Sequence, residues 1–239
     1  DLGCYGSSIE TPNIDSLASN GLRYSNFYNT GRCWTTRASL MTGLYQHQVG
    51  KAMSFGEKAP PAYQGNIPRD VPFLSELLQA EGYRTYHLGK WHLNSRFGEV
   101  EQSWPLGRGF EKSYCIVSQN NFFAPWVMRD ESEILRRPKD PKLWPKDYYI
   151  TNAITDRAVE YLQMHFDSDQ DAPFFMYLAH TAPHFPLHAP QNVIDKYRHH
   201  FEHGWDEERR RRHQRLNQEG IVVGDLSPRD ATVPAWSSL

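Results

Sequence analysis

Cys33 and Arg37 lie four residues apart in the stretch GRCWTTRASLMTG, which starts at Gly31 and has the residue types of a short helix. We expect Thr35 or Thr36 to cap this helix, so that backbone N–H groups near the thiol point toward an incoming anion. The planar guanidinium of Arg37 adds a fixed positive charge that suits tetrahedral oxyanions. The stretch therefore predicts an anion pocket beside a cysteine.

A buried structural cysteine beside Trp34 is the alternative interpretation of Cys33, because free cysteines are often buried. The Cys-x5-Arg phosphate loop of cysteine phosphatases does not match, since Ser39 occupies its arginine position. The chain has three cysteines, with Cys4 and Cys115 as the others, and they cannot all pair with one another. A disulfide framework is therefore not expected.

The stretch GKWHLN places Lys90 and His92 two residues apart. If strand geometry continues through it, both side chains project from the same face of the strand. This would bring a cation and a titratable imidazole to one place. The alternative is a strand end with two solvated side chains.

The stretch HTAPHFPLHAP carries His180, His184 and His188 at intervals of four, a spacing that on a helix would suggest a metal site. Its prolines at positions 183, 186 and 190 interrupt any helix, so a zinc site is not favoured. We interpret the stretch as a rigid loop whose imidazoles serve acid-base chemistry or anion binding. The alternative is a structural loop with partly hydrogen-bonded histidines.

Helices that alternate with short apolar strands position these stretches. Apolar spacing, prolines and glycines predict helices within residues 11–21, 72–82 and 151–166 and strands at residues 22–28, 83–88 and 174–179. This order predicts an α/β domain with a largely parallel sheet flanked by helices. Each of the three stretches follows a strand, where ligands gather in such sheets. We interpret two other segments, 51–70 and 97–148, as supporting or substrate-side loops.

Composition narrows the function classes. The 239 residues carry a formal net charge of −2, so no global basic field favours nucleic acid. We expect the arginine-rich run at residues 207–215 to be a solvated helix. No apolar run reaches membrane-spanning length, and no secretory signal opens the chain. The chain starts at Asp1 and not at a methionine, which we interpret as an internal start.

Four stretches together resemble successive landmarks of the sulfatases, particularly the arylsulfatase-like enzymes of the alkaline phosphatase superfamily. They are DLGCYGSSIETPNIDSLASNGLRYSNFY, CWTTRASLMTGLYQHQVG, GYRTYHLGKWHLN and PFFMYLAHTAPHFPLHAP. The resemblance continues to about Trp236, through LSPRDATVPAW. It implies the alkaline phosphatase-like α/β fold, incomplete in this chain, with residues 1–239 forming a partial sulfatase catalytic domain.

By this resemblance the chain is a sulfuric ester hydrolase in which a formylglycine-generating or maturase enzyme converts Cys33 to formylglycine. The hydrated aldehyde attacks sulfur with one oxygen and expels sulfate with the other. Lys90 and Arg37 then hold the diol and sulfate oxygens. His92 assists collapse of the diol, and His184 stabilises or protonates the departing alcohol, so that Lys90 and His184 contact substrate. Calcium is expected as a cofactor, with Cys33, as formylglycine, its one ligand within this chain.

Two departures from the family pattern keep other functions open. Thr35 stands where the family has proline or, less often, alanine. The paired aspartates and the Asp-Asn pair that hold calcium are expected outside this sequence, so we expect the isolated chain to bind calcium poorly and to be inactive. The alternatives are a phosphonate or phosphodiester hydrolase of the same superfamily, or a degenerate, non-catalytic sulfate-binding member.

Substrate and location follow from the resemblance alone. The expected substrate is a small sulfate ester or a sulfated glycan, and neither nucleic acid nor a membrane span is expected. By resemblance the protein is exported to the periplasm, the cell exterior or the lysosome.

Overall fold

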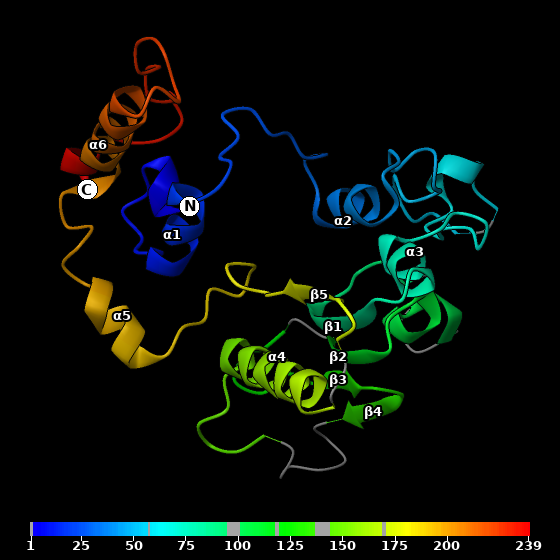
Figure 1. The fold of residues 1–239 in the computed structure, drawn as a ribbon. Helices are drawn as coiled ribbons and strands as arrows, with labels where there is room; N and C mark the ends of the chain where they lie inside the picture. Colours follow the sequence, from blue (N-terminus) through cyan, green and yellow to red (C-terminus); the bar gives the residue numbers. More distant parts are fainter. Residues whose placement is uncertain (1, 57, 95–100, 118–119, 137–143, 169–170) are drawn as a thin grey trace. The chain divides into compact units, whose positions relative to one another are not determined.

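The computed structural model of the chain describes residues 2–56, 58–94, 101–117, 120–136, 144–168 and 171–239. It contains two compact units (Figure 1). One comprises residues 29–188, and the other comprises residues 1–28 together with residues 189–239.

A five-stranded sheet forms the centre of the 29–188 unit, in the order β4-β3-β2-β1-β5. The strands are β1 (Arg84–Lys90), β2 (Lys112–Ile116), β3 (Val127–Asp130), β4 (Glu133–Arg136) and β5 (Phe174–Ala179). β1 pairs in parallel with both β2 and β5, whereas β3 pairs antiparallel with β2 and β4. The α/β prediction is confirmed, and the sheet is mixed.

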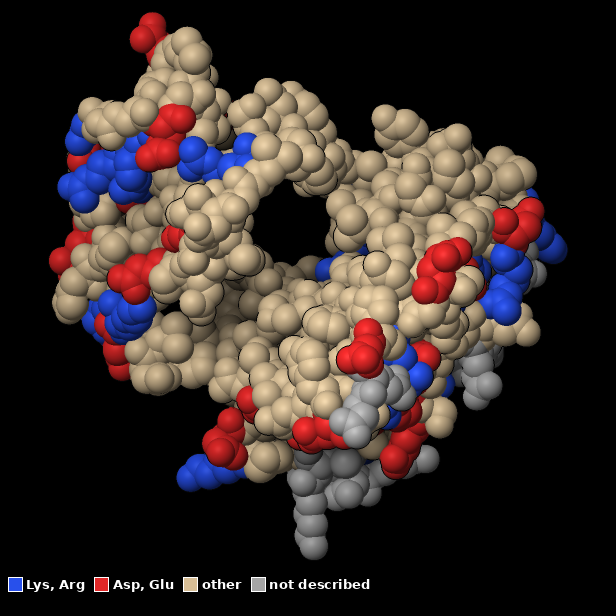
Figure 2. All heavy atoms as spheres, in the orientation of Figure 1, with Lys and Arg blue, Asp and Glu red and all other residues tan. Residues whose placement is uncertain are grey.

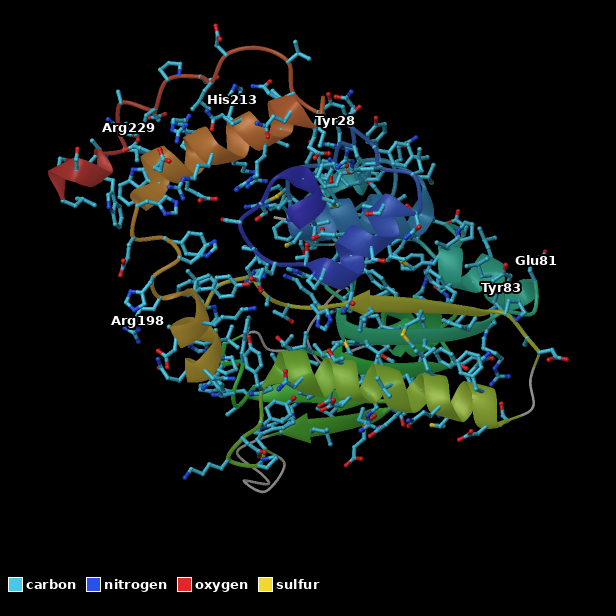
Figure 3. All side chains as sticks on the ribbon, turned by 60° about the vertical axis from the view of Figure 1, so that its left-hand side comes forward. Tyr28, Glu81, Tyr83, Arg198, His213 and Arg229 are labelled. Carbon is cyan, nitrogen blue, oxygen red and sulfur yellow. The ribbon has the colours of Figure 1, made fainter. Side chains whose placement is uncertain are left out.

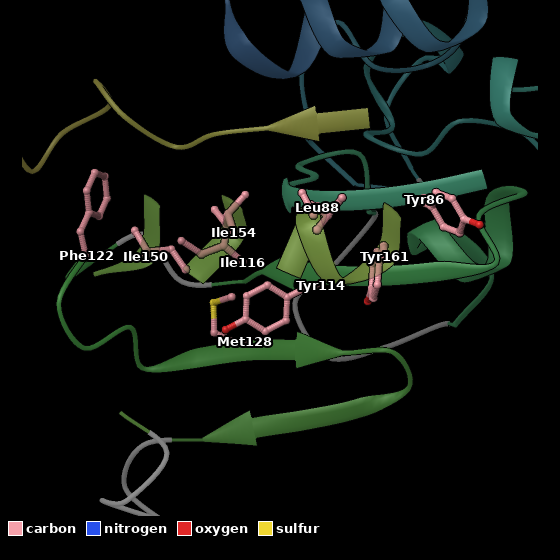
Figure 4. Close-up of a cluster of buried hydrophobic side chains, with 10 residues drawn as sticks. Tyr86, Leu88, Tyr114, Ile116, Phe122, Met128, Ile150, Ile154 and Tyr161 are labelled. Carbon is pink, nitrogen blue, oxygen red and sulfur yellow. The ribbon is translucent and has the colours of Figure 1, made fainter. Parts of the chain in front are cut away.

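Helix α4 (Ile150–Asp167) covers one face of this sheet (Figure 4). Its residues Ile154, Ala158 and Tyr161 are buried, as the helical spacing predicts. They join an apolar cluster with alternate residues of the strands: Tyr86, Leu88, Tyr114, Ile116 and Met128. The sheet face and the helix face therefore form one core.

The opposite face of the sheet carries α2 (Cys33–Thr42) and α3 (Leu74–Ala80). A second apolar cluster lies on this face and includes Ala38 and Met41 of α2 with Phe73, Trp91 and Cys115. The expected apolar side of α3, with Leu74, Leu77 and Leu78, is not buried. Phe73 and Ser75 are buried in its place.

Gly89 lets β1 approach β5 closely just before Lys90. Its φ of 96° lies in the region that favours glycine, and a Cβ there would lie 2.1 Å from the carbonyl oxygen of Ala179. No side chain fits between the two strands at this position.

Two of the sequence expectations for this fold are wrong. The 97–148 segment contains β2, β3 and β4 in addition to loops. Its strands are short and include buried charged residues such as Arg129, so they lack an apolar run like that of β5. The 22–28 segment is not a strand, because alternation makes a strand only where a partner pairs with it, and Phe27 and Tyr28 are more than four-fifths exposed.

Short helices and connecting segments make up the other unit. They are η1 (Gly3–Tyr5), α1 (Pro12–Ser19), α5 (Gln191–Tyr197), α6 (Gly204–Gln218) and η6 (Trp236–Ser238). The larger unit contains three further 3-10 helices: η2 (Pro61–Tyr63), η3 (Glu101–Ser103) and η4 (Pro105–Arg108). α1 confirms the predicted first helix. α6 contains the arginine-rich run, and basic and acidic side chains lie side by side over this unit (Figure 2).

The segment that follows α6 is bound to it by polar contacts (Figure 3). His213 Nε2 donates to the carbonyl oxygen of Gly224 at 3.0 Å, and Arg229 Nε lies 3.0 Å from an Asp206 carboxylate oxygen. All three cysteines are free. Among the helices of the described ranges, none has the length and apolarity needed to cross a membrane.

Candidate active site

Cys33 is the first residue of α2. Arg32, with extended backbone angles, precedes it as the N-cap residue and makes no side-chain cap. The predicted cap by Thr35 or Thr36 is therefore wrong: Thr35 lies within the first turn and its Oγ1 donates back to the Arg32 carbonyl at 2.9 Å. The first N–H groups of a helix lack helical partners, so the positive end of the α2 dipole lies at Cys33.

His92 lies beside this thiol. Its Nδ1 is 3.5 Å from Cys33 Sγ, and its ring meets the Trp34 ring edge-on at 5.4 Å between centroids. β1 ends at Lys90, and His92 has a φ of 61°. The predicted strand face therefore does not continue from Lys90 to His92. A left-handed backbone conformation at His92 brings the two residues together instead.

Arg37 connects α2 to the sheet. Its Nη1 donates to the carbonyl oxygen of Lys90 at 2.6 Å and to the hydroxyl of Tyr177 on β5 at 3.0 Å. Burial raises the pKa of Tyr177, an effect that the Arg37 guanidinium partly offsets, so this hydroxyl is neutral. Because both acceptors are neutral, they hold the guanidinium in place without cancelling its charge.

Lys90 is buried, with 3% of its surface exposed. Burial and the Arg37 charge lower the pKa of Lys90, and Cys33 opposes that shift. Lys90 therefore interacts electrostatically with both the Cys33 thiol and the Arg37 guanidinium.

The imidazole of His92 is held neutral. Burial is the main cause that lowers its pKa to about 4, and four basic side chains add to the effect: Lys90, Lys51, Arg37 and His184. At neutral pH this ring is therefore uncharged and has one nitrogen that can accept a hydrogen bond beside Cys33.

Lys51 is a buried cation of this group that the sequence analysis missed. It is 4% exposed, and its Nζ donates to the carbonyl oxygens of Gly65 at 2.7 Å and Asn94 at 3.0 Å. Burial lowers its pKa to about 8. Its sequence context, VGKAM, resembles an exposed loop and gives no signal of burial. The sequence analysis also missed Tyr177. Its hydroxyl group is the polar group within the otherwise apolar run FFMYLA, and that contrast could have identified it.

His184 lies at the rim of the group and not within it. It is exposed, its Nδ1 donates to the Phe185 carbonyl oxygen at 2.5 Å, and its charge acts on His92. His188 has a structural role, since it accepts from the backbone N–H of Phe122 and its carbonyl accepts from Tyr149. His180 is half-buried, and its Nδ1 has no hydrogen-bond partner. The loop is not helical, as predicted.

Calcium prefers oxygen ligands, and this group does not offer them. Within the described part of the chain, no three His, Cys, Asp or Glu side chains form a group that could hold a metal ion. The side chains around Cys33 are cations and imidazoles. By themselves they do not fit calcium.

The structure thus places four of the five predicted residues, Cys33, Arg37, Lys90 and His92, in one contiguous group, with His184 at its rim. Comparison with known proteins identifies the class. The Sulfatase family model matches residues 1–222, so the chain belongs to the sulfatase family. The assignment of residues 1–239 to one partial catalytic domain stays a prediction.

Several relatives agree with this assignment. The chain is 31% identical to an uncharacterized sulfatase of Schizosaccharomyces pombe, covering 95% of this chain and 43% of that protein. It is 27% identical to an arylsulfatase of Klebsiella aerogenes, covering 94% and 49%. It is 32% identical to human N-acetylgalactosamine-6-sulfatase, covering 81% and 39%. The chain therefore spans less than half the length of these curated relatives.

Solved structures support the same fold. The crystal structure of Ps i-CgsB superposes with a TM-score of 0.66 at 27% identity, covering 92% of this chain and 52% of that one. The complex of Ps i-CgsB with k-i-k-neocarrahexaose superposes with a TM-score of 0.63. The architecture is thus the alkaline phosphatase-like fold of the sulfatases.

Proposed function

We propose that the protein to which this chain belongs hydrolyses sulfate esters at Cys33. The observation that carries the proposal is the position of this residue: it begins α2, lies 3.5 Å from the neutral His92 imidazole and is near two basic side chains, Arg37 and Lys90. A tetrahedral dianion or monoester is the ligand that such a cationic pocket favours. Because the chain belongs to the sulfatase family, we take the central atom of this tetrahedral ligand to be sulfur.

Formylglycine at position 33 is part of the proposal. It would supply a hydrated aldehyde as the nucleophile, and the surroundings fit it, because a hydroxyl at the sulfur position would lie beside an imidazole that can accept its proton. Thr35 is compatible with the same first turn, since its hydroxyl holds the Arg32 carbonyl.

The remaining side chains have separate tasks in this proposal. Arg37 and Lys90 bind the sulfate oxygens and stabilise the negative charge that grows on them in the transition state. His92 accepts a proton at Nδ1. His184, exposed at the rim with Nδ1 bound to a carbonyl, keeps Nε2 available to donate a proton to the leaving alcohol oxygen.

Carbohydrate sulfates are the substrate class we favour, with small sulfate esters as test compounds. Two relatives support this choice: an N-acetylgalactosamine-6-sulfatase and a structure solved with a neocarrahexaose. Export of the protein is inferred from the resemblance only.

Calcium remains an expectation of the family resemblance, and its oxygen ligands would have to come from outside the Cys33 group. Loss of activity on chelation with EGTA, and its recovery with added calcium, is the result expected for the full-length protein. Activity that persists after exhaustive chelation would remove calcium from the proposal.

Sulfate release is the direct test. We expect the full-length protein from its native host to release sulfate from 4-nitrophenyl sulfate, and Cys33→Ala to abolish that release. Cys4→Ala is the matched control and should leave the rate unchanged. A faster rate on a matched 4-nitrophenyl phosphodiester would instead favour the phosphodiesterase alternative.

Mass spectrometry tests the nucleophile. Trypsin cleaves after Arg32 and Arg37, and the peptide between them should be lighter than its thiol form by about 18 Da, with one sulfur and two hydrogens exchanged for oxygen. An intact thiol in this peptide would favour the non-catalytic, sulfate-binding alternative. A modified peptide without sulfate release from any ester would contradict the proposed reaction.

A substitution at position 35 tests whether threonine there limits the modification of Cys33. Thr35→Pro should keep the helix, because proline is tolerated in a first turn, and should raise the modified fraction. Thr36→Pro is the control: it removes the N–H that donates to the Arg32 carbonyl at 2.9 Å and should disrupt the turn. An unchanged modified fraction in Thr35→Pro would show that residue 35 does not limit the modification.

A further inference from the structure

A cavity in the 29–188 unit lies apart from the Cys33 group. It has a volume of about 290 Å³ and is enclosed by the 102–107 segment and by side chains of β2 and β3, among them Cys115 and Arg129. Trp104, Pro105 and Leu106 give it apolar walls. This cavity shares no residue with the candidate active site. Its size suits a small organic ligand.

Arg129 is buried in this cavity wall without an anionic partner. It is 8% exposed, and its guanidinium carbon lies 4.7 Å from the centroid of the Trp104 ring. Within the described ranges, its side chain makes that ring contact and no hydrogen bond or ion pair. A buried cation costs free energy unless it is paired, so an anion would be bound here favourably.

Arg108 is a buried arginine of the same unit that has both a carbonyl and a carboxylate partner. It is 2% exposed and also stacks on a ring, that of Phe73, at 3.9 Å. Its Nη2 donates to the Val71 carbonyl at 2.5 Å and lies 3.3 Å from the Glu76 carboxylate. Arg129 also stacks on a ring, that of Trp104, but within the described residues it contacts neither a carbonyl oxygen nor a carboxylate.

The cavity carboxylate, Glu131, does not fill this role. One of its oxygens accepts from the Tyr161 hydroxyl at 2.9 Å and the other accepts from the Ser113 N–H at 3.2 Å. Lys112 Nζ lies 3.9 Å from it as well. Its charge is thus compensated by groups other than Arg129.

We propose that this cavity binds a small organic carboxylate, whose two oxygens engage the Arg129 guanidinium while its apolar body contacts the walls. The planar fork of arginine matches a carboxylate, and the apolar walls favour a carbon skeleton over a hydrated inorganic ion. The proposal does not depend on the sulfatase reaction.

Calorimetric titration of the full-length protein with benzoate tests the site. We expect a dissociation constant on the order of 1 mM, and binding at least about tenfold weaker for benzamide, which has the same shape without the charge. Inorganic sulfate should compete weakly, because it lacks the apolar body. Equal binding of benzoate and benzamide, or no benzoate binding, would overturn the proposal.

Variants locate the binding. Arg129→Gln should abolish benzoate binding and leave sulfate release unchanged, and Trp104→Phe, which keeps an aromatic wall, should retain binding. Arg37→Lys should keep benzoate binding, because that residue belongs to the other anion pocket. Benzoate binding that survives Arg129→Gln but is lost in Arg37→Lys would overturn the proposal. So would a crystal structure of the full-length protein with one of its own carboxylates on Arg129.

Discussion

Helix α6 and the Cys33 group both concentrate basic side chains, yet they treat the charge in opposite ways. On α6, the exposed Glu207 carboxylate accepts from Arg210 at 2.6 and 2.7 Å and from Arg211 at 2.7 Å. Around Cys33, Arg37 is held by a carbonyl and a neutral hydroxyl.

The difference shows how a protein keeps a positive field where it is useful. A carboxylate partner cancels the charge of an arginine in water, and such exposed pairs contribute little to stability. A neutral acceptor fixes the geometry and leaves the charge to act on a ligand. The charge on α6 is therefore compensated within the helix, and in the proposed reaction the charge near Cys33 remains available for the sulfate oxygens.

Replacing the held guanidinium should have the largest effect. Arg37→Lys keeps the charge, but it shortens the side chain and removes the planar guanidinium, whose Nη1 donates to both the Lys90 carbonyl and the Tyr177 hydroxyl. We expect kcat/KM for sulfate release by the full-length protein to fall by about 10² to 10⁴. Arg210→Lys on α6 is the matched control and should have no effect. Equal effects of the two substitutions would remove the distinction between the regions.

Lys51 tests the cost of a buried cation without a carboxylate. Its pKa is about 8 in the fold and 10.5 as a free side chain, so the unfolded state binds more protons between these pH values. The free energy of unfolding should therefore rise between pH 8 and 10.5, by on the order of 3 kcal/mol from this group. Lys51→Met should remove that rise in guanidinium melts. An unchanged slope would show that Lys51 is not buried as a cation.

Tyr177 tests the value of a neutral acceptor. Tyr177→Phe removes the hydroxyl that accepts from Arg37 but leaves the bond to the Lys90 carbonyl. The expected loss is about 1 kcal/mol, or roughly fivefold in kcat/KM. Tyr63→Phe, in the same unit, is a control that should leave kcat/KM unchanged. A loss as large as that of Arg37→Lys would mean that the hydroxyl itself contacts the substrate.

Glu207 should give the smallest effect. Hydrogen bonds and charge from Arg210 and Arg211 lower its pKa to about 2. Its contribution to stability is therefore present above about pH 4.5 and lost as the pH falls toward 2. Glu207→Gln should leave the unfolding midpoint at pH 7 nearly unchanged and flatten its acid dependence, more at low than at high salt. A large loss at pH 7 would contradict the view of α6 as a solvated helix.

Local sequence patterns predicted the elements that carry the site. β5 is an apolar run that follows a helix, β1 follows a helix that ends near a glycine, and α2 contains the predicted helical stretch, so Cys33, Lys90 and the histidine loop could be placed near strand or helix ends. The 22–28 segment shows the limit of this reasoning, because alternation describes one strand and says nothing of its partner.

The arrangement within the site could not be read in the same way. His92 reaches Cys33 through a left-handed backbone conformation that is uncommon for residues other than glycine, and no sequence rule predicts it. Lys51 is buried by contacts with Gly65 and Asn94, which are distant in sequence. Such positions depend on tertiary packing and not on local propensity.

Gly89 bears on how genetic data for this family would be interpreted. Its lack of a side chain allows β1 to lie against the Ala179 carbonyl, one residue before Lys90. In a mutational scan scored by activity, every substitution at Gly89 would register as a loss, as at Cys33 or Arg37, although Gly89 bears no chemical group that acts on a substrate. Intolerance to substitution at this strand end therefore marks backbone geometry as well as catalysis, and scoring protein abundance alongside activity would separate the two.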